Sequence, residues 1–253
     1  MFPYASGLNI FPDIKIIDFC YVMTVILQSD EKNKILLPSG CSSIMKKRLS
    51  EMSLEELWQL FPIFLTRHQS HWDTWYREEA EMLQETIGSK HILRISHIGS
   101  TAITDIWAKP IIDILVEISL DSNLYEVKES ILNNGYICMS ESSTRISFNK
   151  GYTENGFKER VFHLHARYAG DNDELYFRDY LNENLPLAKQ YESLKLSLWK
   201  KYRHNRDAYT DNKTEFISHC TQKAKKAYGS RYQCFQGKRK EYQVPFPLMQ
   251  DLS

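Results

Sequence analysis

Apolar residues recur every three or four positions in several segments of the chain, which is the spacing of one face of a helix. The first such segment follows Ser53-Leu54-Glu55-Glu56, a capping box in which serine and glutamate side chains bond the free backbone amides of a helix start. The pattern predicts six helices, over residues 54–65, 71–86, 124–133, 173–183, 186–204 and 209–228.

Shorter segments rich in β-branched and alternating residues predict strands between these helices. They cover residues 91–97, 111–118, a short run after Gly135-Tyr136, 145–148 and 160–168. Residues 111–118 are almost continuously apolar, so we expect this strand to lie inside the sheet. A polar loop joins the last two strands and predicts a hairpin. The order of elements predicts an α+β fold: a mixed β-sheet with helices on one side, an N-terminal helical hairpin and C-terminal helices.

Three parts of the chain differ in character. Residues 1–50 begin apolar and become polar, and we expect them to be an appended, poorly packed segment. Residues 51–230 hold all the predicted elements and form the main domain, and residues 231–253 form a tail. Of the 253 residues, 42% are hydrophobic and 25% are charged, which excludes a disordered or low-complexity protein.

The sequence predicts a cytoplasmic protein without a membrane anchor. Its most apolar early run, residues 14–27, contains Lys15 and Asp18 and is shorter than the ~20 residues of a transmembrane helix. No signal-peptide cleavage site follows that run. The five cysteines are widely spaced and odd in number, which is typical of reduced thiols rather than of a disulfide framework or zinc site.

Charge is balanced overall but not locally. Lys and Arg together number 32, as do Asp and Glu, so the chain lacks the overall basic charge of a general nucleic-acid binder. Residues 189–240, however, contain 14 Lys or Arg against 4 Asp or Glu. We interpret this stretch either as a solvated helix face with a basic tail or as a surface that faces phosphates or nucleic acid.

Candidate chemistry gathers where the first predicted strand ends. Gly99-Ser100-Thr101 forms a turn of small residues, and Asp113 lies on the next strand. The backbone amides and hydroxyl of such a turn, with the positive end of a short helix after it, can hold a phosphate. A carboxylate on the neighbouring strand can then hold Mg²⁺ against that phosphate. From these residues alone, a β-turn followed by a buried aspartate that caps a loop is the better explanation of the pattern.

Several motifs occur in the order typical of one known family, and they span about residues 53–228. The segments that resemble the GrpB-like family are His97–Ala102, Lys109–Ile114, Phe162–His165, Phe177–Leu181, Tyr191–Lys195 and Tyr209–Ile217. The resemblance implies a nucleotidyltransferase-like fold with a polymerase-β-like core, in which a Gly-Ser turn and an Asp-x-Asp/Glu strand hold a nucleotide and two metal ions. It also implies that Asp113 is a catalytic metal ligand and that Gly99, Ser100 and Thr101 bind phosphate.

One position departs from that pattern, because Leu115 replaces the second acid of Asp-x-Asp. Glu117 shares the face of Asp113 but lies ~13 Å further along the strand, at ~3.3 Å per residue. It therefore cannot replace the missing ligand. Three alternatives remain: a site with one metal, ligands supplied by another strand, or nucleotide binding without transfer.

Further residues are predicted to complete the site, each with a purely structural role as its alternative. His163 and His165 point to one face of a strand with Cα atoms ~7 Å apart, so they can contact phosphate, and His165 is also a candidate metal ligand. The candidate contacts to phosphate or base are Lys109, Arg178, Tyr209 and Lys213. The cations around the hairpin that could face the same cleft are Arg145, Lys150 and Arg160.

Three functions are consistent with these residues. The leading hypothesis is a protein that binds a nucleoside triphosphate with Mg²⁺ and transfers its nucleotidyl group to an unidentified acceptor. The second is a catalytically degenerate module that binds a nucleotide or CoA-like ligand, and Leu115 favours it. The third is an RNA-binding protein that uses the basic C-terminal helices, whose affinity would fall steeply with salt. The first two predict a nucleotide or another phosphorylated small molecule as partner.

Overall fold

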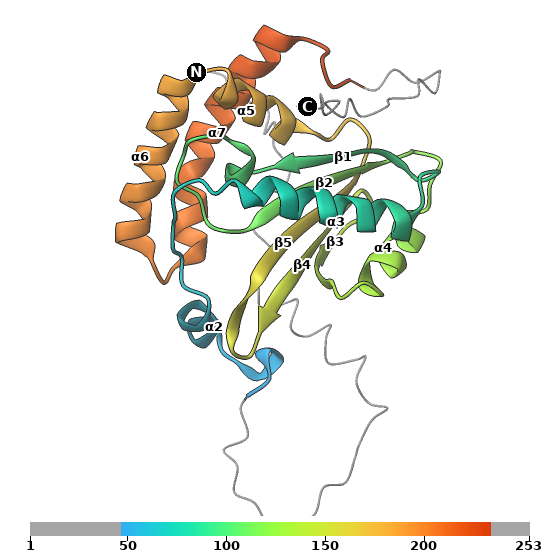
Figure 1. Cartoon of the computed structure of the whole chain (residues 1–253), viewed down its shortest axis with the longest axis horizontal. Coiled ribbons are helices and arrows are strands. Elements are labelled where there is room, and N and C mark those ends of the chain that lie inside the picture. Colours follow the sequence, from blue (N-terminus) through green and yellow to red (C-terminus); the bar gives the residue numbers. More distant parts are fainter. Residues whose placement is uncertain (1–46, 234–253) are drawn as a thin grey trace, which may run out of the picture.

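The computed structural model describes residues 47–233, which form a mixed five-stranded sheet flanked by helices (Figure 1). The strand order is β1-β2-β5-β4-β3, with β2 and β5 parallel and every other neighbouring pair antiparallel. The strands are β1 (Ile92–Ile98), β2 (Ile112–Ile118), β3 (Ile137–Glu141), β4 (Arg145–Thr153) and β5 (Gly156–Tyr168). The predicted mixed sheet, the interior position of β2 and the β4–β5 hairpin are confirmed. Predictions about residues 1–46 and 234–253 lie outside the described part of the chain.

The helices follow the predicted segments closely. They are α2 (Leu54–Leu60), α3 (His71–Ile87), α4 (Leu124–Leu132), α5 (Asp173–Asn182), α6 (Leu185–Tyr202) and α7 (Arg206–Tyr228), with short 3₁₀ turns at Leu49–Glu51 (η1) and Ser100–Ala102 (η2). The capping box of Ser53 and Glu56 forms as predicted. Helix α2 nevertheless ends at Leu60 instead of residue 65, because Pro62 disfavours a helical conformation at Phe61.

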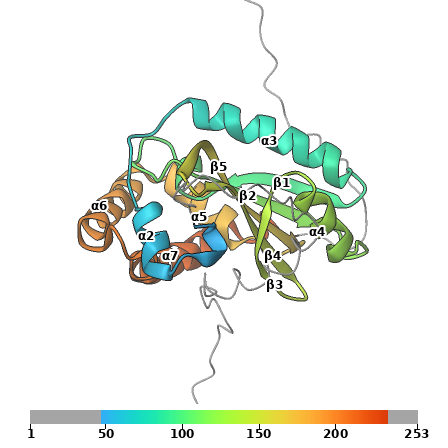
Figure 2. The ribbon, with the colours of Figure 1, turned by 90° about the horizontal axis from the view of Figure 1, so that it is seen from below.

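One face of the sheet carries the main hydrophobic core. Alternate residues of β2 point into it, and α3 and α4 cover it with side chains such as Trp72, Leu83 and Ile131, all of them completely buried. Figure 2 shows α3 lying along this side of the sheet. The 3.6-residue period of α3 explains this arrangement, since its apolar stripe needs an apolar surface to cover.

The C-terminal helices lie on the other side of the sheet (Figure 2). Leu175 of α5 packs against Leu115 of β2 and Ile98 of β1, which belong to the face opposite the main core. Helices α5, α6 and α7 enclose a second apolar cluster around Tyr191 and Cys220. The prediction of helices on only one side of the sheet is therefore wrong, because the apolar residues of α5 are buried against the second face.

The predicted N-terminal helical hairpin is also wrong. The segment between α2 and α3 is extended, and Thr66 forms an isolated bridge with Ala108. Phe61, at the end of α2, packs on Phe157 of the β4–β5 hairpin with ring centroids 5.0 Å apart. Both views show α2 well separated from α3 (Figures 1 and 2). The aromatic contacts at this hairpin thus hold α2 apart from α3, its neighbour in sequence.

Within residues 47–233, no helix is both long and apolar enough to cross a membrane.

Candidate functional site

Asp113 lies near the start of β2, on the face opposite the main core. Its side chain is 27% exposed, whereas Ile112 and Ile114 on either side of it are completely buried. The antiparallel register places Asp113 beside Ile98 at the end of β1, directly before the Gly99-Ser100 bend. The carboxylate and the small-residue turn are thus brought together, as the sequence predicts.

Gly99 makes this approach geometrically feasible. Its φ of 71° is a left-handed conformation that favours glycine, and a Cβ atom at this position would overlap the Asp113 carboxylate. The short helix expected after the bend is only the three-residue turn η2, so it contributes little helix dipole. The bend therefore offers backbone and hydroxyl groups, not a helix N-terminus.

Thr101 fixes the bend from behind. Its hydroxyl donates to the carbonyl oxygen of Ile111, 3.1 Å away, and lies 2.9 Å from Nε2 of His97. Burial is the main reason why the pKa of His97 falls to about 4, so His97 is a neutral structural residue. Because Thr101 is fully buried, we expect it to hold the turn in place and not to contact a ligand itself.

His163 and Asp113 are register partners on the parallel strands β2 and β5. Their Nδ1 and Oδ1 atoms lie 3.1 Å apart, and Nε2 of His163 lies 2.8 Å from the hydroxyl of Tyr152. Arg206 in turn donates to that hydroxyl over 3.2 Å. A continuous chain of hydrogen bonds therefore runs from Asp113 to Arg206.

This chain favours the charged forms of its first two members. Burial by itself would raise the pKa of Asp113, but the hydrogen bond and positive charge of His163 lower it below its usual value. Burial would likewise lower the pKa of His163, but Tyr152 and Asp113 together raise it. Each member of the pair thus favours the charged form of the other.

Three basic residues lie near this pair, and we call Lys109, Arg206 and Lys213 the cationic cluster. Asp113 interacts electrostatically with both lysines, and Arg206 contacts Tyr152. Lys109 and Lys213 lie over the ring of Tyr209, with Nζ atoms 5.4 and 4.5 Å from its centroid. Among the described residues, neither lysine forms an ion pair with a carboxylate or a hydrogen bond to another side chain. The guanidinium of Arg206 lies over the rings of Tyr152 and Phe157.

The charges of the cluster repel one another. Burial, only partly opposed by Asp113 and reinforced by the nearby Arg206, lowers the pKa of Lys213 to about 8. Burial, Lys213 and Arg206 also lower the pKa of Lys109. Behind the cluster, burial and Lys213 lower the pKa of Lys195 to about 7. The site therefore concentrates positive charge around one carboxylate, an arrangement that an anionic ligand would stabilise.

Tyr209 supports the cluster instead of facing a ligand. Its side chain is only 1% exposed and packs with Ile63 and Leu198. The spacing of Arg206, Tyr209 and Lys213 places all three on one face of α7, since residues three and four apart are neighbours on a helix. Sequence reasoning identified Lys213 and Tyr209 but missed Arg206 and Tyr152. The helical spacing from Tyr209 could have identified Arg206.

The donors expected for a pair of metal ions are absent from the described residues. Leu115 is completely buried and packs with Ile98 and Leu175. Glu117, also completely buried, forms an ion pair with Arg94 and accepts a 2.8 Å hydrogen bond from Asn172. No group of three or more His, Cys, Asp or Glu that could hold a metal ion occurs within residues 47–233. The donor set therefore does not fit two metals, and Asp113 alone does not make a protein-held Mg²⁺ site.

Two further candidates are engaged elsewhere. His165 pairs with Leu115 in the register, and its Nδ1 lies 3.2 Å from the Ser147 hydroxyl, while burial lowers its pKa to about 4. Arg178 donates to the backbone carbonyl of His97 over 2.8 Å and pairs with Asp179. Arg178 thus braces the end of β1, and His163 rather than His165 contacts Asp113.

Each cation that flanks the β4–β5 hairpin forms an ion pair with a carboxylate: Arg145 with Asp171, Lys150 with Glu79, and Arg160 with Glu78. The expectation that they point into the cleft is wrong for Lys150 and Arg160, which turn toward α3. Arg145 shares the sheet face of His163 but is held by Asp171. Glu78 and Glu79 belong to α3, so two of these cations attach the hairpin to the helix that covers the main core.

The fold and site define an α+β protein with a mixed sheet, in which an interior strand presents one carboxylate to a Gly-Ser bend and a cationic cluster. The family model described as GrpB protein matches residues 62–223, which include every residue of this site. The chain belongs to the GrpB family.

Similar proteins cover most of the same region. The chain is 34% identical over 161 residues to the glutamate-rich protein GrpB of Alkalihalophilus pseudofirmus, an alignment that spans 61% of this chain and 91% of that protein. It is 30% identical over 179 residues to the UPF0157 protein YqkA of Bacillus subtilis, spanning 68% of this chain and 51% of the relative. The crystal structure of the conserved protein GrpB from Enterococcus faecalis superposes with a TM-score of 0.57 and 32% identity, over 65% of this chain and 99% of that one.

Proposed function

We propose that this protein binds the phosphate groups of a phosphorylated small molecule at the cationic cluster. The single observation that carries this proposal is that three basic side chains gather at one place: Lys109 and Lys213 lie over the ring of Tyr209, and Arg206 donates to Tyr152. The nearby carboxylate of Asp113 is already paired with His163. Lysines and arginines positioned without acidic partners are what phosphate recognition requires. The adjacent Gly99-Ser100 bend adds small polar groups to the same place.

Of the functions predicted from the sequence, this proposal develops the binding module. Nucleotidyl transfer by two metal ions requires a second carboxylate near Asp113, and its expected position is filled by Leu115. The positive charge that metal ions would supply in such a site comes instead from the side chains of the cluster. We therefore expect phosphate binding that does not depend on Mg²⁺.

Calorimetric titration with inorganic tripolyphosphate, with and without Mg²⁺, tests this proposal. We expect binding in the absence of Mg²⁺ and a loss of about tenfold or more in affinity in Lys213→Gln, because a charge-assisted contact contributes about 1.5–3 kcal/mol. The matched control is Lys226→Gln, since Lys226 lies on the same helix but is solvent-exposed. An equal loss in both variants, or no binding at all, would contradict the proposal.

The Mg²⁺ arm of the experiment separates the two leading hypotheses. If the cluster binds phosphate without a metal ion, Asp113→Asn should retain tripolyphosphate binding in the absence of Mg²⁺. If binding instead requires Mg²⁺ and is lost in Asp113→Asn, Asp113 acts as a metal ligand. Incubation with labelled nucleoside triphosphates and a metabolite pool would then reveal nucleotidyl adducts.

A further inference from the structure

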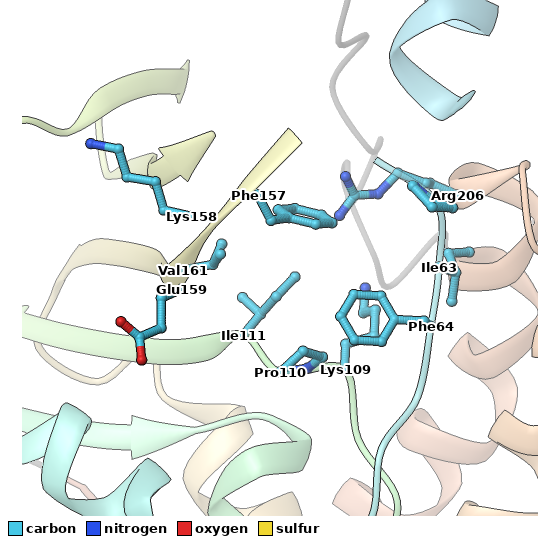
Figure 3. Close-up of a pocket in the computed structure, with 11 residues that line it drawn as sticks. Ile63, Phe64, Lys109, Pro110, Ile111, Phe157, Lys158, Glu159, Val161 and Arg206 are labelled. Carbon is cyan, nitrogen blue, oxygen red and sulfur yellow. The ribbon is translucent and has the colours of Figure 1, made fainter. Parts of the chain in front are cut away.

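A pocket of about 310 Å³ opens beside the cationic cluster (Figure 3). Two members of the cluster, Lys109 and Arg206, also line this pocket. The rest of its wall is mainly apolar and comes from the segment after α2, the loop before β2 and the start of β5. The pocket and the proposed phosphate site are therefore continuous. Phosphate binding at the cluster does not by itself require a ligand in the pocket, so the role of the pocket is a separate question.

The pocket presents aromatic surface at its mouth. Phe64 is 36% exposed, whereas its neighbours Ile63 and Leu65 are buried. Its ring centroid lies 6.5 Å from that of Phe157, with the two planes inclined by 58°. The two rings are therefore in direct contact, and Phe157 is also packed by Phe61 and Tyr152, so the exposed ring of Phe64 is the surface on which a further aromatic group can stack.

Arg206 joins the aromatic wall to the charged site. Its guanidinium lies 5.9 Å from the centroid of Phe157. It also donates to the hydroxyl of Tyr152, which the series of hydrogen bonds described above connects through His163 to Asp113. In Figure 3 Phe64, Phe157 and Arg206 converge on the pocket, whereas Lys158 and Glu159 extend away from it. A planar cation held on an aromatic ring can contact phosphate at its edge and an aromatic ligand at its face.

From this arrangement we infer that the ligand carries a flat aromatic group, which stacks on Phe64 in the pocket, beside Ile111, while its phosphates lie on the cationic cluster. This inference rests on the proposed function and specifies the chemical class of the ligand. The volume is at the small end of the range for ligand pockets, so it accommodates one ring system and leaves the phosphates outside. Aliphatic phosphates would fill the pocket without the stacking that Phe64 provides.

The test compares ATP with inorganic tripolyphosphate, which presents a similar chain of phosphates without an aromatic group. Both are titrated into the full-length protein without Mg²⁺. We expect ATP to bind at least about tenfold more tightly, since stacking of a base on an aromatic side chain has an effect of about this size. Phe64→Ala should remove this difference and leave the affinity for tripolyphosphate unchanged. Tyr125→Ala, which removes an aromatic ring that is 60% exposed on α4, is the matched control and should change neither affinity.

The outcomes distinguish this inference from the proposed function. If tripolyphosphate binds but ATP does not bind more tightly, or if the tighter binding of ATP survives in Phe64→Ala, the pocket does not hold the aromatic group and the inference is overturned.

A comparison of isopentenyl diphosphate with inorganic pyrophosphate provides a second check. An equally large gain in affinity for this aliphatic ligand would also overturn the aromatic assignment. If Lys213→Gln leaves the affinity for tripolyphosphate unchanged, the proposed function itself fails. Circular dichroism verifies that each variant is folded, and Phe64→Tyr should retain the preference for ATP.

Discussion

The two faces of strand β2 carry different kinds of residues over the same length of chain. On one face, Ile112, Ile114, Val116 and Ile118 are all completely buried against α3 and α4. On the other face, Asp113 is partly exposed to solvent and lies near the cationic cluster. Leu115 packs with Ile98 and Leu175, and Glu117 pairs with Arg94. The comparison shows that a uniform apolar face stabilises the fold, while the mixed face provides a place for a charged site.

The largest effect is expected on the uniform face. Ile114→Ala should lower the free energy of unfolding by about 3 kcal/mol, because the substitution leaves a cavity in a core that cannot fully close. Urea denaturation measures this loss. The affinity of the folded protein for tripolyphosphate should not change, and a loss of stability below about 1 kcal/mol would contradict the division of roles between the two faces.

On the mixed face, Glu117→Gln is expected to cost about 2 kcal/mol of stability. The buried carboxylate pairs with Arg94 and accepts from Asn172, and removing its charge leaves the arginine without its counter-ion. The cost is smaller than for a fully buried pair because the Arg94 side chain is partly exposed. Thermal and urea unfolding should show this loss, whereas exposed Glu129→Gln should be nearly neutral. A large decrease in ligand affinity would instead place Glu117 in the site.

The contact between Gly99 and Asp113 can be tested by a double-mutant cycle. Gly99→Ala should destabilise the protein by about 1–2 kcal/mol, since alanine is strained at this positive φ and its Cβ atom would overlap the carboxylate. The loss should be smaller when Asp113→Ala is also present, because the overlapping group is then gone. Strictly additive effects in urea denaturation would mean that the carboxylate does not lie against the bend.

The smallest effect concerns pH. The pKa of Lys213 is lowered to about 8, so its positive charge is lost as the pH rises through that value. Affinity for tripolyphosphate should therefore fall several-fold between pH 7 and pH 9, within about tenfold. Lys213→Gln should show a flatter profile over the same interval. If affinity depended on pH identically in the unchanged protein and in Lys213→Gln, Lys213 would not contact the ligand.

Of the two faces of β2, the apolar face that stabilises the fold was predicted more completely from the sequence than the face that carries the charged site. Periodicity and capping residues located the helices and strands, because local spacing determines which side chains can be buried together. The turn at Gly99 and its carboxylate Asp113 were also recognisable, since small residues and an interior strand have specific patterns. The three cations could not be assembled in the same way, because Lys109 and Lys213 come together only through packing of α7 against the loop before β2.

The incorrect predictions have similar physical origins. The cations of the β4–β5 hairpin pair with residues of α3 or with Asp171, and sequence spacing does not reveal such long-range partners. Helix α2 lies against the hairpin instead of against α3, because Phe61 packs on Phe157 and Tyr152. In both cases a contact between distant segments overrides the arrangement expected from neighbours along the chain.

The most direct test of the central claim is a crystal structure of the protein soaked with tripolyphosphate. We predict electron density for phosphate within hydrogen-bonding distance of Lys213 and Arg206, on the same face of β2 as Asp113. Density at another surface, with the cationic cluster empty at a saturating concentration of tripolyphosphate, would contradict the claim.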